Sequence, residues 1–413
     1  MKEFLLSELL QIKNGRDYKH LSKGPYPVFG SGGLMQYVDD YLYDKPSILL
    51  PRKGSLTNIQ YADTPFWTVD TLYYTEVDNS KVNAYYLYYY LKLLDLSNLD
   101  SGTGVPSMTF DSYYNIKVSL PSLTEQNRIA ILLQKLDKTI AVKQQINDYL
   151  EAMARQLYDY WFVQYDFPNE NGKPYRSSGG KMVWNEKLRR EIPAIWGIDS
   201  IGSKKIYNSD YTANGSFASL AENVRYNEGE PYALLVRIVD LNGEFFEDGN
   251  FVYINKHGYN FLKSCSLQGD EIIICNVGNA GATYRCPRLG CPMSLGPNGI
   301  VINDPLYNHF LYEYFKSPIG QHQIRTISSG SIQMKFNKTN FRELPIPFPD
   351  NRIIHLFNEV YGKLFEEKNL IWAERKELTR IKNKLLPSLM NGQVSVKQLN
   401  NHLSVLKGQN LGI

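Results

Sequence analysis

Apolar residues recur every three or four positions along two long stretches of the chain, and this spacing predicts two long helices. One helix is expected over residues 122–167 and the other over residues 350–391. Such a period forms a seam that packs against a partner helix. The expected seam residues are Ile129, Leu132, Leu136, Ile146, Leu150, Met153 and Leu157 in the first stretch and Ile354, Phe357, Tyr361, Leu364, Ile371, Leu378 and Leu385 in the second.

Both stretches have recognisable boundaries. Polar residues that cap helix N-termini stand at the starts, and prolines at positions 121, 347 and 349 precede them. The first stretch has no helix breaker before Pro168, and the second has none before Pro387. Lys143 and Lys368 fall at equivalent positions of the two seams, as a register-setting polar pair would.

Four short sequence patterns occur twice in the same order, about 225 residues apart. Residues 47–54 (SILLPRKG) resemble 271–278 (EIIICNVG), and residues 83–90 (NAYYLYYY) resemble 308–315 (NHFLYEYF). The Gly/Ser loop before Met108-Thr109-Phe110 has a counterpart before Met334-Lys335-Phe336. Asn127-Arg128-Ile129 recurs as Asn351-Arg352-Ile353. A nearly constant offset predicts a tandem duplication.

Outside the two long helices, short β-rich runs alternate with turns and one short helix in each copy. The expected division is a globular domain at 1–121, a helix at 122–167, a linker at 168–189, a second globular domain at 190–349, a helix at 350–391 and a tail at 392–413. The predicted fold class is α+β, with two globular mixed α/β domains separated by two antiparallel, coiled-coil-like helices in a pseudo-twofold tandem repeat.

Helices of this length extend for about 50–60 Å at 1.5 Å per residue. One turn of B-DNA is about 34–36 Å, so two similar modules on such a spacer match the geometry of a protein that binds a bipartite DNA site. Since the two copies differ in sequence, the two half-sites are expected to differ. The predicted target is an asymmetric, interrupted sequence.

The composition is that of a globular protein with two or three domains. The 413 residues are 43% hydrophobic and 21% charged, with a formal net charge of +3. No apolar run is long enough to cross a bilayer, and the first residues are too acidic for a secretory signal, so no membrane association and a cytoplasmic location are expected. The 31 tyrosines suit a recognition surface, or they fill β-sheet cores.

All four cysteines, Cys265, Cys275, Cys286 and Cys291, lie in the second half. Cys286 and Cys291 could face each other across a hairpin, but Cys265 and Cys275 are spaced too widely for the second pair of a structural zinc site. Disulfides are unfavourable in a cytosolic chain. Reduced cysteines in a core are therefore expected, with no bound metal.

The order of recognition domain, long helix, recognition domain and long helix resembles the specificity subunit (HsdS) of type I restriction–modification systems. The motifs that carry the resemblance include Pro27–Gly33, the two Gly/Ser loops, Leu120-Pro121 and its counterpart Ile346-Pro347, and Glu125–Ile129 at the start of the spacer helix. Each motif is weak alone, and their duplicated order is specific. The resemblance covers nearly the whole chain.

The resemblance implies the partners and the cofactors. Such a subunit binds double-stranded DNA, two modification subunits that methylate adenine, and restriction subunits that translocate and cleave DNA. S-adenosylmethionine, ATP and Mg²⁺ are then expected on the partner subunits, with no cofactor and no catalytic residue in this chain.

The sequence motifs agree with a non-catalytic role. No phosphate-binding loop of the Gly-x-x-x-x-Gly-Lys-Ser/Thr type occurs. Asn303–Tyr307 differs from the adenine methyltransferase box because Leu306 stands in place of its second proline. Glu366-Glu367-Lys368 has the spacing of a nuclease metal site but lies inside the predicted helix, where a solvated face is expected.

The candidate DNA-binding residues are polar or aromatic and lie in predicted loops. Arg, Lys and small hydroxyls bind phosphates, while Arg favours guanine and Asn or Gln favours adenine. In the first domain they are Arg52, Lys53, Ser55, Asn58, Ser101, Thr103 and Ser107; in the second they are Tyr211, Thr212, Asn214, Ser216, Asn223, Arg225, Tyr226, Arg285, Arg288, Ser331, Gln333 and Lys335. Ordinary surface charges and connecting turns are the alternative for each.

Two other functions remain open at this stage. A coiled-coil scaffold with two ligand-binding heads would show no salt-dependent affinity for DNA. A stand-alone methyltransferase or nuclease would act without a partner.

Overall fold

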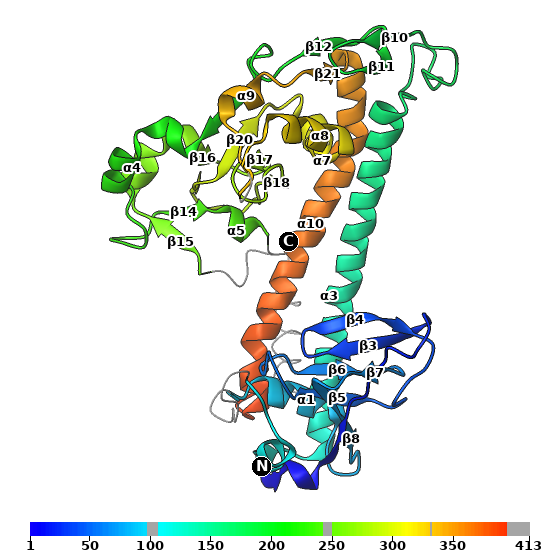
Figure 1. Ribbon diagram of the computed structural model, residues 1–413. Coiled ribbons are helices and arrows are strands. Elements are labelled where there is room, and N and C mark those ends of the chain that lie inside the picture. Colours follow the sequence, from blue (N-terminus) through cyan, green and yellow to red (C-terminus); the bar gives the residue numbers. More distant parts are fainter. Residues whose placement is uncertain (97–105, 243–249, 331–332, 395–413) are drawn as a thin grey trace, which may run out of the picture. The chain divides into compact units, whose positions relative to one another are not determined.

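A computed structural model describes residues 1–96, 106–242, 250–330 and 333–394 of the chain (Figure 1). The chain forms two compact units: unit 1 comprises Met1–Gln144 with Glu374–Ile413, and unit 2 comprises Gln145–Ala373. The long helices α3 (Leu123–Tyr158) and α10 (Asn351–Met390) each contribute residues to both units. A π-helical turn, Asp159–Val163, follows α3.

Unit 1 contains two sheets, a two-stranded ladder and short helices. Its elements are β1 (Lys2–Leu5), β2 (Leu10–Asn14), β3 (Tyr26–Gly30), β4 (Gly33–Val38), β5 (Ser47–Pro51), β6 (Gln60–Ala62), β7 (Trp67–Thr68), β8 (Leu72–Val77), α1 (Ala84–Lys92), α2 (Phe110–Tyr114) and β9 (Lys117–Leu120). The sheets have the orders β2-β8-β5-β6 and β4-β3-β7, and β1 pairs with β9.

Unit 2 also consists of short strands and short helices, and it has more of them than unit 1 in the part of the chain that the structure describes. They are β10 (Met182–Asn185), β11 (Arg190–Pro193), β12 (Gly197–Asp199), β13 (Tyr207–Asp210), α4 (Phe217–Asn223), β14 (Ala233–Val236), α5 (Ile238–Leu241), β15 (Val252–Ile254), α6 (Lys256–Phe261), β16 (Ser266–Leu267), β17 (Ile272–Cys275), β18 (Thr283–Arg285), β19 (Met293–Leu295), β20 (Gly299–Asn303), α7 (Asn308–Lys316), α8 (Pro318–Ile327), α9 (Lys338–Arg342) and β21 (Ile346–Phe348).

The two units share a strand order. The sheet β13-β20-β17-β18 of unit 2 has the same order of equivalent strands as β2-β8-β5-β6 of unit 1. In the second sheet, β14 pairs antiparallel with β15 and parallel with β19, just as β3 pairs with β4 and β7. β16 is an addition on the edge of that sheet in unit 2. The repeated sequence patterns thus occupy equivalent strands and helices, with α1 matching α7.

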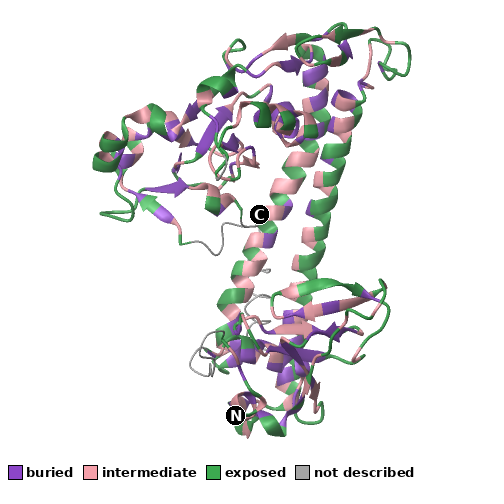
Figure 2. Cartoon of the chain, viewed as in Figure 1, coloured by how far each residue is buried: buried purple, intermediate pink, exposed green. Residues whose placement is uncertain are grey.

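The central strands β5 and β17 are buried along their whole length. In β17, Ile272 and Ile274 join the main core of the unit while Ile273 packs on the other face. Burial on both faces explains why these strands have a continuous apolar run instead of alternating polar and apolar residues. Figure 2 shows the buried residues of unit 2 concentrated on its sheets and on the adjoining helices.

The seam expected for the second long helix lies on the inner side of α10. Ile354, Phe357, Tyr361 and Ile371 are buried. Leu364, Leu378 and Leu385 are half-buried. Phe357 is 0% exposed and its ring centroid lies 4.8 Å from that of Phe162.

In the C-terminal half of α3, fully buried residues follow two positions of the expected seam by one residue. Ile146 and Met153 are 38% and 53% exposed, whereas Asn147 and Ala154, one residue later, are buried. One residue corresponds to a rotation of about 100° around a helix with 3.6 residues per turn. The buried face continues to the C-terminal end of the helix and beyond it, because buried Tyr158 and Trp161 continue the spacing of Asn147 and Ala154.

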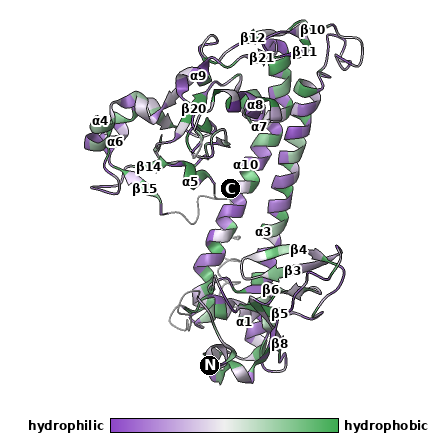
Figure 3. Ribbon diagram, in the orientation of Figure 1, coloured by the Kyte–Doolittle hydropathy of each residue, from purple (hydrophilic) through white to green (hydrophobic). Residues whose placement is uncertain are grey.

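Leu132, Leu136, Leu150 and Leu157 are half-buried, and only Ile129 of the predicted α3 series is fully buried. Polar and apolar residues alternate along both long helices (Figure 3). A prediction based only on hydropathy therefore placed part of the α3 seam on the face next to the buried one.

The ion pairs within each unit have an antiparallel register between α3 and α10. In unit 1, Lys143 pairs with Glu374 and Asp137 pairs with Lys382. In unit 2, Glu151 of α3 pairs with Lys368 at 2.5 Å. In unit 1 the partner's number on α10 rises as the number on α3 falls. In unit 2 Phe162, just beyond α3, packs on Phe357 while Glu151 pairs with Lys368, so the two helices run in opposite directions in each unit.

One carboxylate on α3 connects the helices of each unit to its globular part. Asp137 accepts hydrogen bonds from Tyr85 and Tyr89 of α1 and from Lys382 of α10. Glu151 accepts from Lys316 of α7 at 2.7 Å and from Lys368. These contacts join α1 and α7 to the long helices.

Candidate nucleic-acid interface

The loop that follows β5 in unit 1 is held by backbone hydrogen bonds. The Arg52 amide donates to the Thr71 carbonyl at 2.9 Å, and the Met108 amide donates to the Arg52 carbonyl at 3.0 Å. The Gly54 amide donates to the Pro106 carbonyl at 3.0 Å. Gly54 has a φ of +89°, a conformation that favours glycine. The loop therefore has a fixed shape.

Side chains predicted to contact DNA gather around this loop. Lys53 and Ser107 form an isolated β-bridge, and Lys53 and Ser55 are exposed. Arg52 is half-buried, donates to the Asp70 carbonyl at 3.3 Å and lies 5.9 Å from the Tyr73 ring centroid. Its guanidinium is thus partly engaged inside the protein. Ser101 and Thr103 lie outside the described residues.

The β3–β4 turn joins the same surface. The Asn58 amide donates to the Ser31 carbonyl at 2.8 Å, and Gln60 donates to the Gly30 carbonyl at 2.8 Å. Asn58 therefore connects two loops of unit 1, and its amide nitrogen is already used for that connection.

Unit 2 repeats this loop frame after β17. The Asn276 amide donates to the Asn298 carbonyl and the Phe336 amide donates to the Asn276 carbonyl, both at 3.1 Å. The Gly278 amide donates to the Met334 carbonyl at 2.9 Å, and Gly278 has a φ of +92°. By these bonds Asn276 is equivalent to Arg52 and Asn298 is equivalent to Thr71.

The same bonds correct one detail of the sequence repeat. Phe336, and not Met334, occupies the position equivalent to Met108, because Phe336 and Met108 donate to equivalent carbonyls. From Arg52 to Met108 the chain advances 56 positions and from Asn276 to Phe336 it advances 60, so this part of the chain is four residues longer in unit 2. Gln333 and Lys335 are exposed there, and Lys335 forms a β-bridge with Val277; Ser331 lies outside the described residues.

A pocket of about 460 Å³ opens beside this loop in unit 2. The lining comes from the segment after β13, from α4, from the loop after β17 and from the turn before β20: Asp210, Tyr211, Thr212, Phe217, Leu220, Ala221, Val224, Tyr226, Asn276, Val277, Pro297, Asn298 and Gly299. Three predicted residues, Tyr211, Thr212 and Tyr226, are among them. Phe217 is 79% exposed, although an aromatic ring gains by burial.

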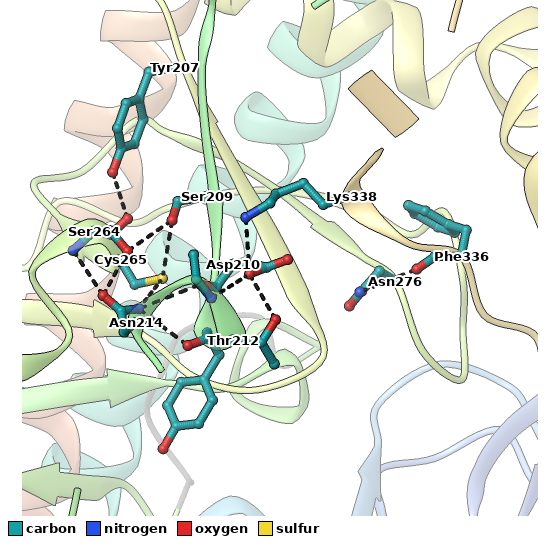
Figure 4. A network of polar contacts seen from close by, with 12 residues as sticks. Tyr207, Ser209, Asp210, Thr212, Asn214, Ser264, Cys265, Asn276, Phe336 and Lys338 are labelled. Carbon is teal, nitrogen blue, oxygen red and sulfur yellow. Dashed lines mark hydrogen bonds and ion pairs between the residues drawn. The ribbon is translucent and has the colours of Figure 1, made fainter. Parts of the chain in front are cut away.

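Charge near the pocket is balanced by an internal ion pair. The Asp210 carboxylate pairs with Lys338 at 3.2 Å and accepts hydrogen bonds from Thr212 and from the Ala213 amide (Figure 4). Burial and a hydrogen bond with Tyr226 raise the pKa of Tyr211, so its hydroxyl stays neutral. A nucleic acid at this pocket would meet neutral hydroxyls and a paired carboxylate.

Three predicted residues of the segment 214–223 instead hold the fold together. Asn214 accepts from the Ser264 hydroxyl at 2.6 Å and donates to the Tyr211 carbonyl at 3.2 Å (Figure 4). Ser216 caps α4 by accepting from the Ser219 amide, and Asn223 donates to the Ser219 carbonyl. Sequence reasoning could not distinguish these internal partners from contacts to DNA.

Arg285 and Arg288 are also engaged within unit 2. Arg285 donates to the carbonyls of Asp270 and Asn308 at 2.8 and 2.9 Å, and its guanidinium lies 4.7 Å from the Tyr312 ring. Burial lowers the pKa of Arg285. Arg288 pairs with Asp270 and with Glu366 of α10. In contrast, Arg225 is exposed. Arg225 therefore stays a candidate DNA contact, whereas the side chains of Arg285 and Arg288 are engaged within unit 2.

The cysteines are all free thiols. Cys265, Cys275 and Cys286 are buried and Cys291 is exposed. Burial raises the pKa of all three buried thiols. Within the described ranges no three His, Cys, Asp or Glu side chains lie close enough together to hold a metal ion.

Two pocket residues that the sequence analysis missed are Asn276 and Asn298. Asn276 aligns with Arg52 in the sequence repeat itself, so the alignment of the two copies could have identified it. Asn298 has no such signal, because only the pairing of β20 with β17 places it next to the loop.

Comparison with known proteins shows what this chain is similar to. Residues 1–152 match the family described as the type I restriction modification DNA specificity domain. The chain is 24% identical over 350 residues to the type I restriction enzyme HindI specificity subunit of Haemophilus influenzae, covering 74% of both chains. It is 23% identical over 366 residues to the MjaIX specificity subunit of Methanocaldococcus jannaschii, covering 87% of this chain and 80% of the relative.

The fold agrees with a solved structure of the same class. The crystal structure of a type I restriction–modification S subunit from M. genitalium has a TM-score of 0.60 to this chain, at 16% sequence identity, with coverage of 94% of this chain and 95% of that one. The resemblance predicted from the sequence is confirmed: the chain is similar to type I restriction–modification specificity subunits over most of its length.

In the part of the chain that the structure describes, no helix is long and apolar enough to cross a membrane.

Proposed function

We propose that this chain recognises an asymmetric, interrupted DNA sequence, with each unit contacting one half-site. The observation that carries the proposal is a shared backbone frame with different side chains. Equivalent hydrogen bonds hold Arg52 and Thr71 in unit 1 and Asn276 and Asn298 in unit 2. Recognition of two different half-sites requires different side chains, and here the same backbone frame carries different side chains in the two units.

The two units present side chains that are suited to different bases. Arginine is suited to the acceptors of guanine, and asparagine is suited to the donor and acceptor of adenine. Asn298, which is exposed, fits the second role, whereas the Asn276 amide nitrogen already donates to the Phe336 carbonyl at 3.4 Å. Lys53 and Ser55 in unit 1 and Arg225, Gln333 and Lys335 in unit 2 are exposed and would bind the phosphates that flank these bases. We attribute the shared frame to duplication of an ancestral recognition domain.

The proposal places catalysis on partner subunits. Two modification subunits would bring S-adenosylmethionine and methylate adenine, and restriction subunits would bring ATP and Mg²⁺. The chain itself would act as a non-catalytic subunit. Methyl transfer by the purified chain without a partner would contradict this division of roles.

A docking surface for a modification subunit is available on α3. Ile146, Tyr149 and Met153 are 38%, 71% and 53% exposed and lie three or four residues apart, so they share one face of the helix. Large exposed apolar side chains in a row are typical of surfaces that bind another protein. Because Asn147 and Ala154 are the buried residues at these two positions, Ile146 and Met153 are left available for this contact.

The test is DNA binding by the chain assembled with its modification subunit. Binding that weakens steeply between about 50 and 200 mM salt is expected, because phosphate contacts release counterions. Replacing Arg225 by alanine is expected to weaken binding, while Arg128→Ala, an exposed arginine on α3, serves as a control. Salt-independent binding, or no binding in any assembly, would favour a scaffold with two ligand-binding heads.

A further inference from the structure

The turn before β20 presents an asparagine whose amide is available to a ligand. Asn298 has a φ of +68°, and its carbonyl accepts the Asn276 amide at 3.1 Å, so its backbone is fixed. The residue is exposed, and within the described parts of the chain no side-chain hydrogen bond is made by its amide. Asn298 lines the pocket beside α4.

The other wall of this pocket is apolar. Leu220 and Val224 are buried and line the pocket together with the exposed Ala221. Phe217, at the start of α4, is 79% exposed although it lines the same pocket. A hydrophobic wall combined with a small number of polar groups is typical of a site that binds a partly apolar ligand in one orientation.

An A·T base pair has this combination of groups at its major-groove edge. Adenine offers the N7 acceptor and the N6 donor, which match the two ends of an asparagine amide. Thymine adds a methyl group, which makes favourable contacts with alanine and phenylalanine. The other base pairs lack one or both of these features.

We propose that the pocket formed by Asn298, Phe217 and Ala221 recognises one A·T pair of the half-site bound by unit 2. The inference rests on the proposed function and adds the base pair and the residues that select it. Asn298 bonds the adenine edge, and Phe217 with Ala221 receives the thymine methyl group. The Asp210 carboxylate does not oppose the approach of DNA, because Lys338 and the Ala213 amide compensate its charge.

Unit 1 differs at the equivalent position. Thr71 stands where unit 2 has Asn298, in the same hydrogen-bonded frame. A threonine lacks the paired donor and acceptor of an amide. The selection of this A·T pair is therefore specific to unit 2 and contributes to the asymmetry of the whole site.

The experiment uses the chain assembled with its modification subunit and a duplex that contains the methylated site of that complex. Single thymines are replaced by deoxyuridine, which lacks the methyl group, and single adenines by 7-deazaadenine, which lacks N7. At one A·T pair of one half-site, we expect 7-deazaadenine to weaken wild-type binding about tenfold or more. Deoxyuridine at the same pair is expected to weaken it by a smaller factor.

Two variants connect these effects to the pocket. Asn298→Gly removes the amide and keeps the backbone conformation, because glycine readily adopts positive φ. This variant is expected to bind adenine and 7-deazaadenine equally at that pair. Phe217→Ala removes an exposed ring and is expected to bind thymine and uracil equally. Trp184→Ala, a change at an exposed aromatic residue outside the pocket, is the control that keeps both preferences.

The outcomes separate this inference from the proposed function. If Asn298→Gly and Phe217→Ala retain both wild-type preferences at every position, the pocket does not select the base pair, while the proposed function stands. If the wild-type complex binds no defined sequence, the proposed function fails and the inference fails with it.

Discussion

Replacing Arg285 by alanine tests whether this arginine stabilises unit 2 and does not contact DNA. The change removes charged hydrogen bonds to the Asp270 and Asn308 carbonyls and the stacking of the guanidinium on Tyr312 and Phe365, at 4.7 and 5.0 Å. Each hydrogen bond from a charged donor contributes about 1.5–3 kcal/mol, and the aromatic contacts add about 1–2 kcal/mol. Because such contributions overlap, we expect a loss of about 4 kcal/mol.

Thermal unfolding followed by tryptophan fluorescence measures this loss. For a unit of this size, about 4 kcal/mol lowers the midpoint of the unfolding transition by about 10 °C. The matched control is Arg225→Ala, because Arg225 is exposed. It is expected to change stability by less than about 0.5 kcal/mol and to weaken DNA binding. If Arg285→Ala unfolds like the wild type and loses DNA affinity instead, the structural role assigned to Arg285 is wrong.

Three further substitutions test the helix pair, the core and the loop frame. Glu151→Gln is expected to lower stability by about 1 kcal/mol, since the partly exposed ion pairs are screened. Burial alone would raise the pKa of Glu151, but the charges of Lys368 and Lys316 outweigh burial and lower this pKa to about 2. This stabilisation is present above the ordinary glutamate pKa of about 4.3 and is lost as the pH falls towards 2. The urea midpoint of the variant is therefore expected to lie below that of the wild type at pH 6, and this difference should be smaller at pH 3. Phe357→Ala removes a fully buried ring and is expected to destabilise unit 2 by about 3–5 kcal/mol, and an unchanged urea midpoint would show that the Phe162–Phe357 contact is not part of the core. Gly54→Ala forces a side chain on a residue with a φ of +89° and places its Cβ 3.3 Å from the Ser31 hydroxyl; it is expected to cost about 1–2 kcal/mol and to reduce DNA affinity, whereas the control Gly32→Ala, with open space around its Cβ, should keep both.

Much of the fold was accessible from the sequence because the chain contains a repeat. The match between residues 47–54 and 271–278 corresponds to the equivalent strands β5 and β17 and the loops that follow them. The 3.5-residue period also located both long helices, and on α10 the predicted series lies on the inner face.

The series predicted for α3 fails at Ile146 and Met153, which are exposed, and the failure has a physical reason. Hydropathy favoured Ile146 and Met153, but the buried face continues to Tyr158 and Trp161 and includes the polar residue Asn147. Asn147 is buried even though it is polar, so its burial does not follow from its own hydropathy. Local periodicity contains no information about such burial.

The candidate DNA contacts show the same limit. Arg225 and Arg285 are the same residue type, and the sequence alone does not separate them. Arg225 is exposed, whereas Arg285 is enclosed by carbonyls and aromatic rings from α7, α10 and the segment before β17. Asn214 likewise bonds Ser264, fifty residues further along the chain. Long-range contacts decide which polar residues remain free for DNA.

The most direct measurement for the whole account is a map of methylated adenines in host DNA after co-expression of this chain with the modification subunit from the same genome. The account predicts methylation at one interrupted sequence whose two half-sites differ, and loss or relaxation of a single half-site when Arg225 is replaced by alanine. Methylation at a palindromic sequence, or a stable complex that leaves the DNA unmodified at any defined site, would contradict recognition of two different half-sites by the two units.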